Sequence, residues 1–190
     1  MGMPAAERRR WTAAQVRQLI ADSPEYGPRY ELIAGELLVT PAPGPRHQAA
    51  LVSIYDRVAP YVRDQGLGYM MWSPADLELA LDELTQPDLF VIPDLRPPAH
   101  WSDFKRLRLT IEALSPSTAR FDRTVKRPFY QRVGVPEYWI VDLDARLVER
   151  WRPSDERPEI IIGKLAWRPD GAQSELLLQL EELWEGLPAE

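Results

Sequence analysis

Apolar positions along the chain follow two periods, one typical of helices and one typical of strands. A capping box at 12–15, followed by apolar residues at helical spacing, predicts a first helix that ends before Pro24. The longest apolar stripe at helical spacing predicts a second helix over 46–64, which Pro60 is expected to kink or shorten. A third helix is predicted over 118–133.

Short apolar or alternating segments predict strands between these helices and after them. Residues 30–33 and 36–40 are expected to form a hairpin. The other strand candidates are 68–72, 76–81, 89–92, 107–114, 138–141, 147–151, 160–162 and 165–167. A terminal helical turn is predicted at 181–184. This mixture, without an internal repeat or a linker, predicts one mixed α/β (α+β) domain over 1–190.

Composition restricts the kind of metal site that the chain can build. The sequence contains no cysteine, which excludes disulfides, cysteine-ligated zinc and thiol nucleophiles. Its two histidines, His47 and His100, are too few for a three-histidine metal site within one chain. Any metal must therefore be held mainly by carboxylates, which suit hard cations such as Mg²⁺ or Mn²⁺.

Charge and hydropathy restrict the partners. No apolar run approaches the roughly 20 residues needed to span a bilayer, so we expect a soluble, cytoplasmic protein without a membrane partner. The net charge of −6 argues against a protein that coats nucleic acid through its phosphates. It does not argue against a nuclease, because a carboxylate metal site is itself acidic until the ion binds.

Acidic side chains lie at three places where the apolar pattern does not favour them. Asp88 precedes an apolar strand, and Glu112 lies near the end of another. Asp122, Lys126 and Tyr130 share one stripe of the third helix, at i, i+4 and i+8. A charge inside an apolar strand is costly unless it is paired or bound to metal. Glu112 is therefore expected to have an oppositely charged partner or a metal ion beside it.

Asp88, Glu112 and Lys126 together have the chemistry of a metal-dependent hydrolase. Two carboxylates from neighbouring strands can share a divalent ion, which activates a bound water, and a lysine can stabilise developing negative charge. Each residue also has a simpler interpretation. Asp88 suits a turn, Glu112 suits a buried ion pair, and Lys126 suits a surface pair with Asp122.

The ordered set of these motifs resembles the Uma-type restriction endonuclease family, a bacterial group within the PD-(D/E)XK nuclease superfamily. The matching positions are 30–37, 45–48, 86–89, 112–118, Asp122, Lys126, Tyr130 and 134–142. They occur in the family's order and cover roughly 30–142, which is most of the chain. Each motif is weak alone, whereas the ordered set is fairly specific.

The resemblance implies a restriction-endonuclease-like core over about 30–142, with a mixed β-sheet flanked by helices. It implies that Asp88 and Glu112 bind Mg²⁺ or Mn²⁺. Leu114 stands where the superfamily usually has its lysine, two residues after the second acid. The family takes this lysine from the following helix, which makes Lys126 the third catalytic residue.

Other positions in the same motifs are further candidates for the site. They are Glu36, His47, Gln48, Ser115, Asp122 and Tyr130. Glu36 equally suits a solvated strand position, and His47 suits helix capping. Ser115 suits either a phosphate contact or a helix cap.

The function expected from the resemblance is metal-dependent hydrolysis of phosphodiester bonds, with DNA as the substrate. Cleavage of both strands would call for two active sites and hence a homodimer. The alternative is a catalytically inactive binding or regulatory module that keeps the nuclease fold. A hydrolase of small phosphoesters is a third class. These alternatives differ in whether divalent metal, Lys126 and polymeric substrate are required.

Overall fold

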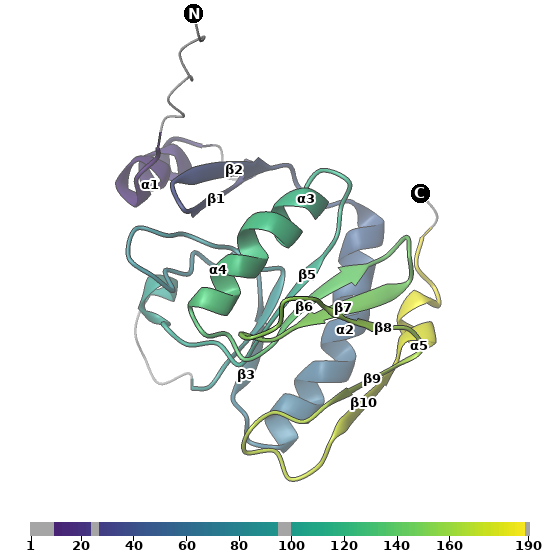
Figure 1. The fold of residues 1–190 in the computed structure, drawn as a ribbon. Coiled ribbons are helices and arrows are strands. Elements are labelled where there is room, and N and C mark those ends of the chain that lie inside the picture. The colour runs from purple at the N-terminus through teal and green to yellow at the C-terminus, as the bar shows by residue number, and fades with distance from the viewer. Residues whose placement is uncertain (1–9, 24–26, 95–99, 189–190) are drawn as a thin grey trace, which may run out of the picture.

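A six-stranded sheet forms the centre of the computed structural model, which describes residues 10–23, 27–94 and 100–188 (Figure 1). The strands are ordered β3-β4-β5-β6-β7-β8 across the sheet. Their bounds are Tyr69–Trp72 for β3, Leu89–Ile92 for β4, Leu109–Ala113 for β5, Tyr138–Asp142 for β6, Leu147–Trp151 for β7 and Glu159–Ile161 for β8. β5 and β6 run parallel and the other neighbours run antiparallel. The mixed sheet flanked by helices confirms the predicted fold class.

Helices cover both faces of this sheet. α2 (Pro45–Asp64) crosses one face, and Figure 1 shows α3 (Ala119–Phe121) and α4 (Arg127–Arg132) on the other. The chain from β5 to β6 passes through α3, the π-helical segment η2 (Asp122–Lys126) and α4. On the α2 side, β9 (Lys164–Trp167), β10 (Leu176–Gln179) and α5 (Leu180–Trp184) extend the core.

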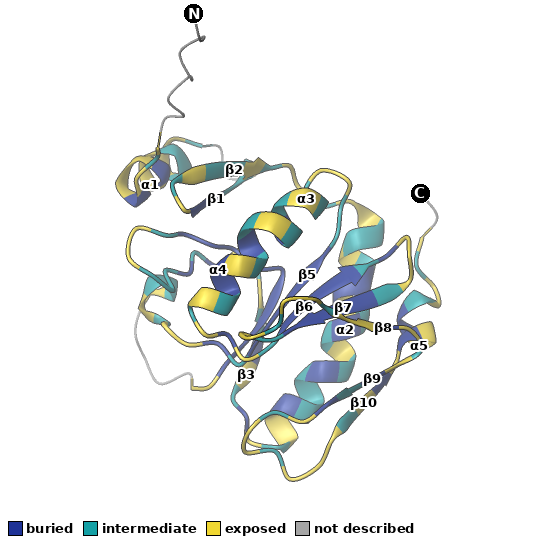
Figure 2. Cartoon of the chain, viewed as in Figure 1, coloured by how far each residue is buried: buried dark blue, intermediate teal, exposed yellow. Residues whose placement is uncertain are grey.

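The two faces of the sheet bury two separate apolar cores, which appear as dark blue strands in Figure 2. Along β5, Leu109, Ile111 and Ala113 pack in the core that contains α2. Because side chains alternate along a strand, Thr110 and Glu112 face the α3–α4 side. Both are buried, so the geometry of the strand turns a carboxylate towards the helix that carries Lys126.

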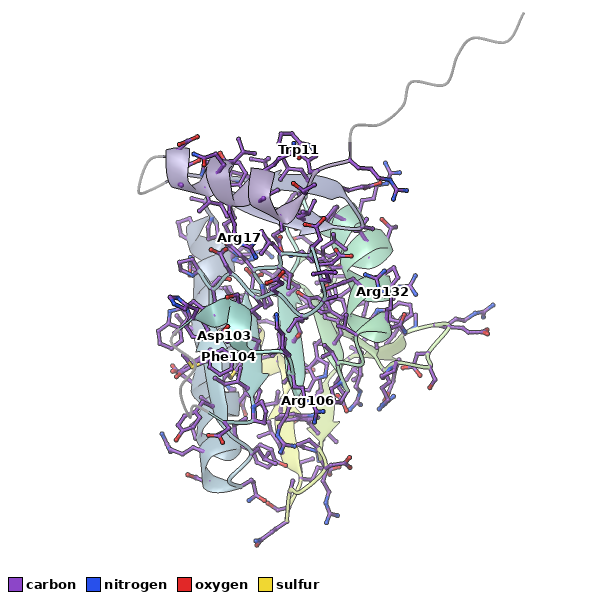
Figure 3. The ribbon with its side chains drawn as sticks, turned by 90° about the vertical axis from the view of Figure 1, so that its left-hand side faces the viewer. Trp11, Arg17, Asp103, Phe104, Arg106 and Arg132 are labelled. Atoms are coloured by element: carbon purple, nitrogen blue, oxygen red, sulfur yellow. The ribbon has the colours of Figure 1, made fainter. Side chains whose placement is uncertain are left out.

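A small layer of structure lies over one end of the sheet. It consists of α1 (Ala13–Asp22) and the hairpin of β1 (Arg29–Ile33) and β2 (Glu36–Thr40). Seen from the side, α1 lies at the top with Trp11 and Arg17, while Asp103 and Phe104, in and just after η1 (Trp101–Asp103), lie below it (Figure 3). Leu32 of β1 is bridged to Leu84, which fixes the hairpin close to the segment that leads into β4.

One expectation about secondary structure was wrong, and one strand was missed. Residues 76–81 form no strand, although Leu77 bridges to Thr85. The chain reverses at Asp82, whose φ is +60°, so Leu81 is left 93% exposed instead of pairing. β10 was not predicted, because its residues lack a regular alternation of apolar and polar side chains.

Neither helical proline ends its helix. Pro60 lies inside α2, yet the helix continues to Asp64 and is not shortened. Pro128 falls in the first turn of α4, where the missing N–H costs little. The predicted third helix is real but divided, because η2 introduces a wider turn in which the Arg127 N–H donates to the Asp122 carbonyl.

The described segments contain no helix with the length and apolar character needed to cross a membrane.

Gly68 is required by the close approach of two backbone segments just before β3. Its φ is +118°, and a Cβ there would overlap the carbonyl oxygen of Ile92. We expect Gly68→Ala to lower the free energy of unfolding by about 2–3 kcal/mol. Gly66→Ala is the matched control, since Gly66 has a φ of +65° but open space around it, and should cost only about 1 kcal/mol. Urea denaturation of both variants measures the difference, and equal losses would contradict this account.

Candidate functional site

Asp88 and Glu112 face each other at the end of the β4–β5 ladder. Leu89 pairs with Ile111, so the next position of the antiparallel register brings Asp88 opposite Glu112. The Ala113 N–H donates to Asp88 Oδ2 at 3.1 Å, and the Asp88 N–H lies 3.4 Å from Glu112 Oε2. Both carboxylates are buried. The structure therefore brings the two predicted acids side by side.

Lys126 joins the acids from three different parts of the chain. Its Nζ lies 2.8 Å from Glu31 Oε2, 2.9 Å from Glu112 Oε1 and 3.6 Å from Asp122 Oδ1. The four side chains are almost fully enclosed. Although burial alone would lower the pKa of Lys126, these carboxylates raise it well above its usual value. Lys126 is therefore protonated at neutral pH.

Asp88 has its own set of donors on the opposite side of the site. Arg29 Nη1 lies 2.8 Å from Asp88 Oδ1, and His47 Nε2 lies 3.0 Å from Asp88 Oδ2. Burial alone would raise the pKa of Asp88, but the contacts from His47 and Arg29 lower it well below its usual range. Asp88 is consequently ionised over the whole physiological range.

Glu112 is in the opposite electrostatic situation. Burial raises its pKa well above the usual value, and the attraction of Lys126 opposes this only in part. The nearby charges of Asp88 and Asp122 raise the pKa of Glu112 further. Glu112 therefore binds a proton more readily than an ordinary glutamate does.

The balance of charge in this group fits a divalent cation. Glu31, Asp88, Glu112 and Asp122 supply four acids, whereas Arg29 and Lys126 supply two permanent cations, so the acids outnumber these cations by two. In the parts of the chain that the structure describes, no three acidic or histidine side chains form a ready-made metal cluster. Mg²⁺ is commonly held by one or two carboxylates, with water and substrate phosphate completing its ligands.

A hollow of about 140 Å³ opens onto these side chains. The acids, Lys126 and Arg29 line its inner part, and the loops after β2 and β5 line its mouth. At the mouth, the Ser115 hydroxyl lies 3.0 Å from the hydroxyls of both Ser117 and Thr118. The hollow thus combines buried acids with hydroxyl groups that are partly or fully exposed.

The structure brings most of the sequence candidates together. Asp88, Glu112, Lys126, His47, Ser115 and Asp122 all line the hollow. Tyr130 is buried beside it, where its hydroxyl lies 2.7 Å from Thr85 Oγ1 and 3.4 Å from Glu112 Oε1. Glu36 and Gln48 are exposed and lie outside its lining, and Gln48 lines a neighbouring hollow instead.

Sequence reasoning missed Glu31 and Arg29. Glu31 carries the same signal as Glu112, a carboxylate between apolar residues of a strand. Its Oε1 accepts from the Gln86 N–H at 2.9 Å and from Thr85 Oγ1 at 3.1 Å, while Oε2 faces Lys126. Arg29 carried no such signal, because it lies at the exposed start of its strand in the sequence pattern.

The raised pKa of Glu112 predicts a pH-dependent effect of the isosteric change Glu112→Gln. A carboxyl with a higher pKa in the folded chain binds more protons when folded, so its contribution to stability falls as pH rises above the unfolded value of 4.5. Glutamine does not titrate, so the Glu112→Gln variant does not lose stability through this group as pH rises. The unfolding free energy of the variant relative to the parent should therefore rise from about pH 4.5 to neutral pH.

Urea denaturation in the presence of a chelator at both pH values measures this difference. Glu156→Gln, at an exposed position, is the control and should show no such change. A difference between Glu112→Gln and the parent that is constant with pH, or that falls as pH rises, would contradict the assignment.

Comparisons with known proteins identify the fold and the family of the chain. A solved structure described as a putative nuclease belonging to DUF820 from Anabaena variabilis shares the fold, with a TM-score of 0.67. It is 23% identical, and the match covers 89% of this chain and 97% of that one. No curated protein matches the chain. The family model of Uma2, described as "Putative restriction endonuclease", matches residues 14–188, so the chain belongs to the Uma2 family.

Proposed function

We propose that the protein is a metal-dependent endonuclease that hydrolyses phosphodiester bonds in DNA. The observation that carries this proposal is the meeting of Asp88, Glu112 and Lys126 in one hollow, where the acids outnumber the permanent cations by two. Membership of the Uma2 family supports the same reaction class.

Asp88 and Glu112 are the residues that would hold Mg²⁺ or Mn²⁺. Each carboxylate oxygen has two lone pairs: Asp88 Oδ2 faces both the Ala113 N–H and His47, whereas Oδ1 accepts from Arg29 and keeps a lone pair for an ion. A bound ion of this kind would lower the pKa of a coordinated water and polarise a phosphoryl oxygen. The role of Arg29 and His47 is to keep Asp88 ionised and oriented towards the hollow.

Lys126 acts as a fixed positive charge in this proposal. Because its pKa is raised, the ammonium group cannot serve as a general base at neutral pH. It can donate to the phosphate oxygens on which negative charge develops during the reaction. Glu31 and Asp122 hold it in place, so that its position does not depend on Glu112 alone.

The hydroxyl groups at the mouth of the hollow are suited to the rest of the phosphate group. Ser115, Ser117 and Thr118 line the hollow and can donate to non-bridging oxygens. Their contacts with one another keep the loop after β5 compact. A phosphodiester entering here would meet these hydroxyl groups first and then Lys126.

Asp88→Asn and Glu112→Gln should each reduce cleavage at least about 100-fold, because each removes one of the charges that the reaction requires. Cleavage of labelled single-stranded DNA, duplex DNA and supercoiled plasmid, with Mg²⁺, Mn²⁺ or chelator, measures this. Glu156→Gln is again the matched control and should cleave like the parent. The near-isosteric substitutions keep the volume of the site.

Parental rates in the Asp88→Asn, Glu112→Gln double variant would overturn the site assignment. Cleavage by the parent that is unaffected by chelator would overturn metal dependence. A parent that binds DNA but cleaves none of these substrates with either metal would support an inactive nuclease-fold binding module instead.

A further inference from the structure

A second hollow of about 310 Å³ lies directly beside the acid site. Arg29 and Asp88 line both hollows, so the two spaces meet at these residues. The rest of the second hollow is formed by α2, by the end of β3 and by the residues that follow β3. Its size is in the range of small-molecule sites. A substrate held at Asp88 would extend into it.

The outer wall of this second hollow is aromatic. Trp72 is the last residue of β3 and pairs in register with Leu89, the residue after Asp88. Trp72 is 56% exposed, an unusually large apolar surface for a residue so close to buried charges. The Tyr55 ring meets it edge-on, with ring centroids 5.2 Å apart at 89°. Tyr55 therefore supports the indole ring while much of the ring remains accessible.

Polar groups complete the lining around this indole ring. Gln48 and Asp56 are exposed residues of α2 that line the same space. An amide and a carboxylate together can accept and donate hydrogen bonds at the edge of a heterocyclic base. An aromatic face, hydrogen-bonding groups and an arginine beside the acid site match the face of a base, its edge and a phosphate group.

Because the protein is acidic, base stacking should contribute more to its affinity for nucleic acid than phosphate contacts do. The net charge is −6, so general attraction to the phosphate backbone is weak. The basic residues before β5, Lys105, Arg106 and Arg108, lie at the opposite end of that strand from Glu112. Arg106 lies low in Figure 3, far from α1. Lys105 pairs with Glu78, and Arg108 donates to the Asp170 carbonyl.

We propose that Trp72 stacks on an unpaired nucleobase next to the scissile phosphodiester. This inference rests on the proposed nuclease function and narrows its substrate class. The bases of an intact duplex are stacked on each other and cannot present a face to Trp72, so the substrate is single-stranded DNA or DNA with an unpaired nucleotide. Gln48 and Asp56 contact the edge of the same base.

Fluorescence anisotropy of labelled oligonucleotides tests this inference without cleavage. The probes are oligothymidylate of about 12 nucleotides and the same strand paired with oligoadenylate, both in chelator. The parent should prefer the single strand. Trp72→Ala should weaken single-strand binding by about 5- to 150-fold and remove most of the preference, while Trp72→Phe should keep part of the affinity.

Tyr69→Ala is the matched control. Tyr69 lies on the same strand and is 48% exposed, but it lies outside the lining of the hollow. The Tyr69→Ala variant should bind both probes with the affinity of the parent. Equal affinities of Trp72→Ala and Tyr69→Ala for the single strand would overturn the stacking inference, as would a parent that prefers the duplex or binds neither probe.

A separate cleavage assay on the same single strand keeps this inference distinct from the nuclease proposal. Trp72→Ala should raise KM and leave kcat nearly unchanged. If the parent cleaves with metal and the variant has an unchanged KM, stacking is wrong and the nuclease proposal stands. If Trp72 is needed for binding but the parent never cleaves, the base site stands and the nuclease proposal is wrong.

Discussion

The buried ammonium group of Lys126 is the interaction on which the rest of the site depends. It brings together Glu31 from β1, Glu112 from β5 and Asp122 from η2, which are far apart in the sequence. Removing one partner from such a buried group leaves an uncompensated charge, which typically costs about 3–5 kcal/mol. The hairpin, the central sheet and the helical crossover are therefore held at one point by electrostatics as well as by apolar packing.

The charge of Lys126 alone does not neutralise the four acids of the site. Arg29 and His47 contact Asp88. The pKa of Glu112 stays raised despite the contact of Glu112 with Lys126. A site that existed only for stability would be expected to have matching charges or apolar residues, since buried ions are costly. The remaining negative charge is instead the property that a carboxylate site for a hard divalent cation requires.

The sequence predicted those parts of the site in which a charge interrupts a regular apolar pattern. Asp88 and Glu112 became candidates this way, whereas Lys126 became one through the family resemblance, since its helical stripe alone also suited a surface pair with Asp122. Glu31 carried the same signal but could be placed only by docking the hairpin against residues 84–86, a long-range contact.

The segment 76–81 was wrongly assigned because alternation of side chains does not reveal whether a partner strand is in reach. The wider turn of η2 left Lys126 and Tyr130 on the same side, so an ordinary helical pattern still identified them.

The proposed function requires Asp88 and Glu112 to bind a divalent cation. Isothermal titration calorimetry of Mn²⁺ into the parent and into the Asp88→Asn, Glu112→Gln double variant tests this claim without any assumption about the substrate. The account predicts saturable binding to the parent that is lost in the double variant, while both proteins remain folded by circular dichroism. Binding of equal affinity and stoichiometry to both proteins, or no saturable binding to the parent, would contradict it.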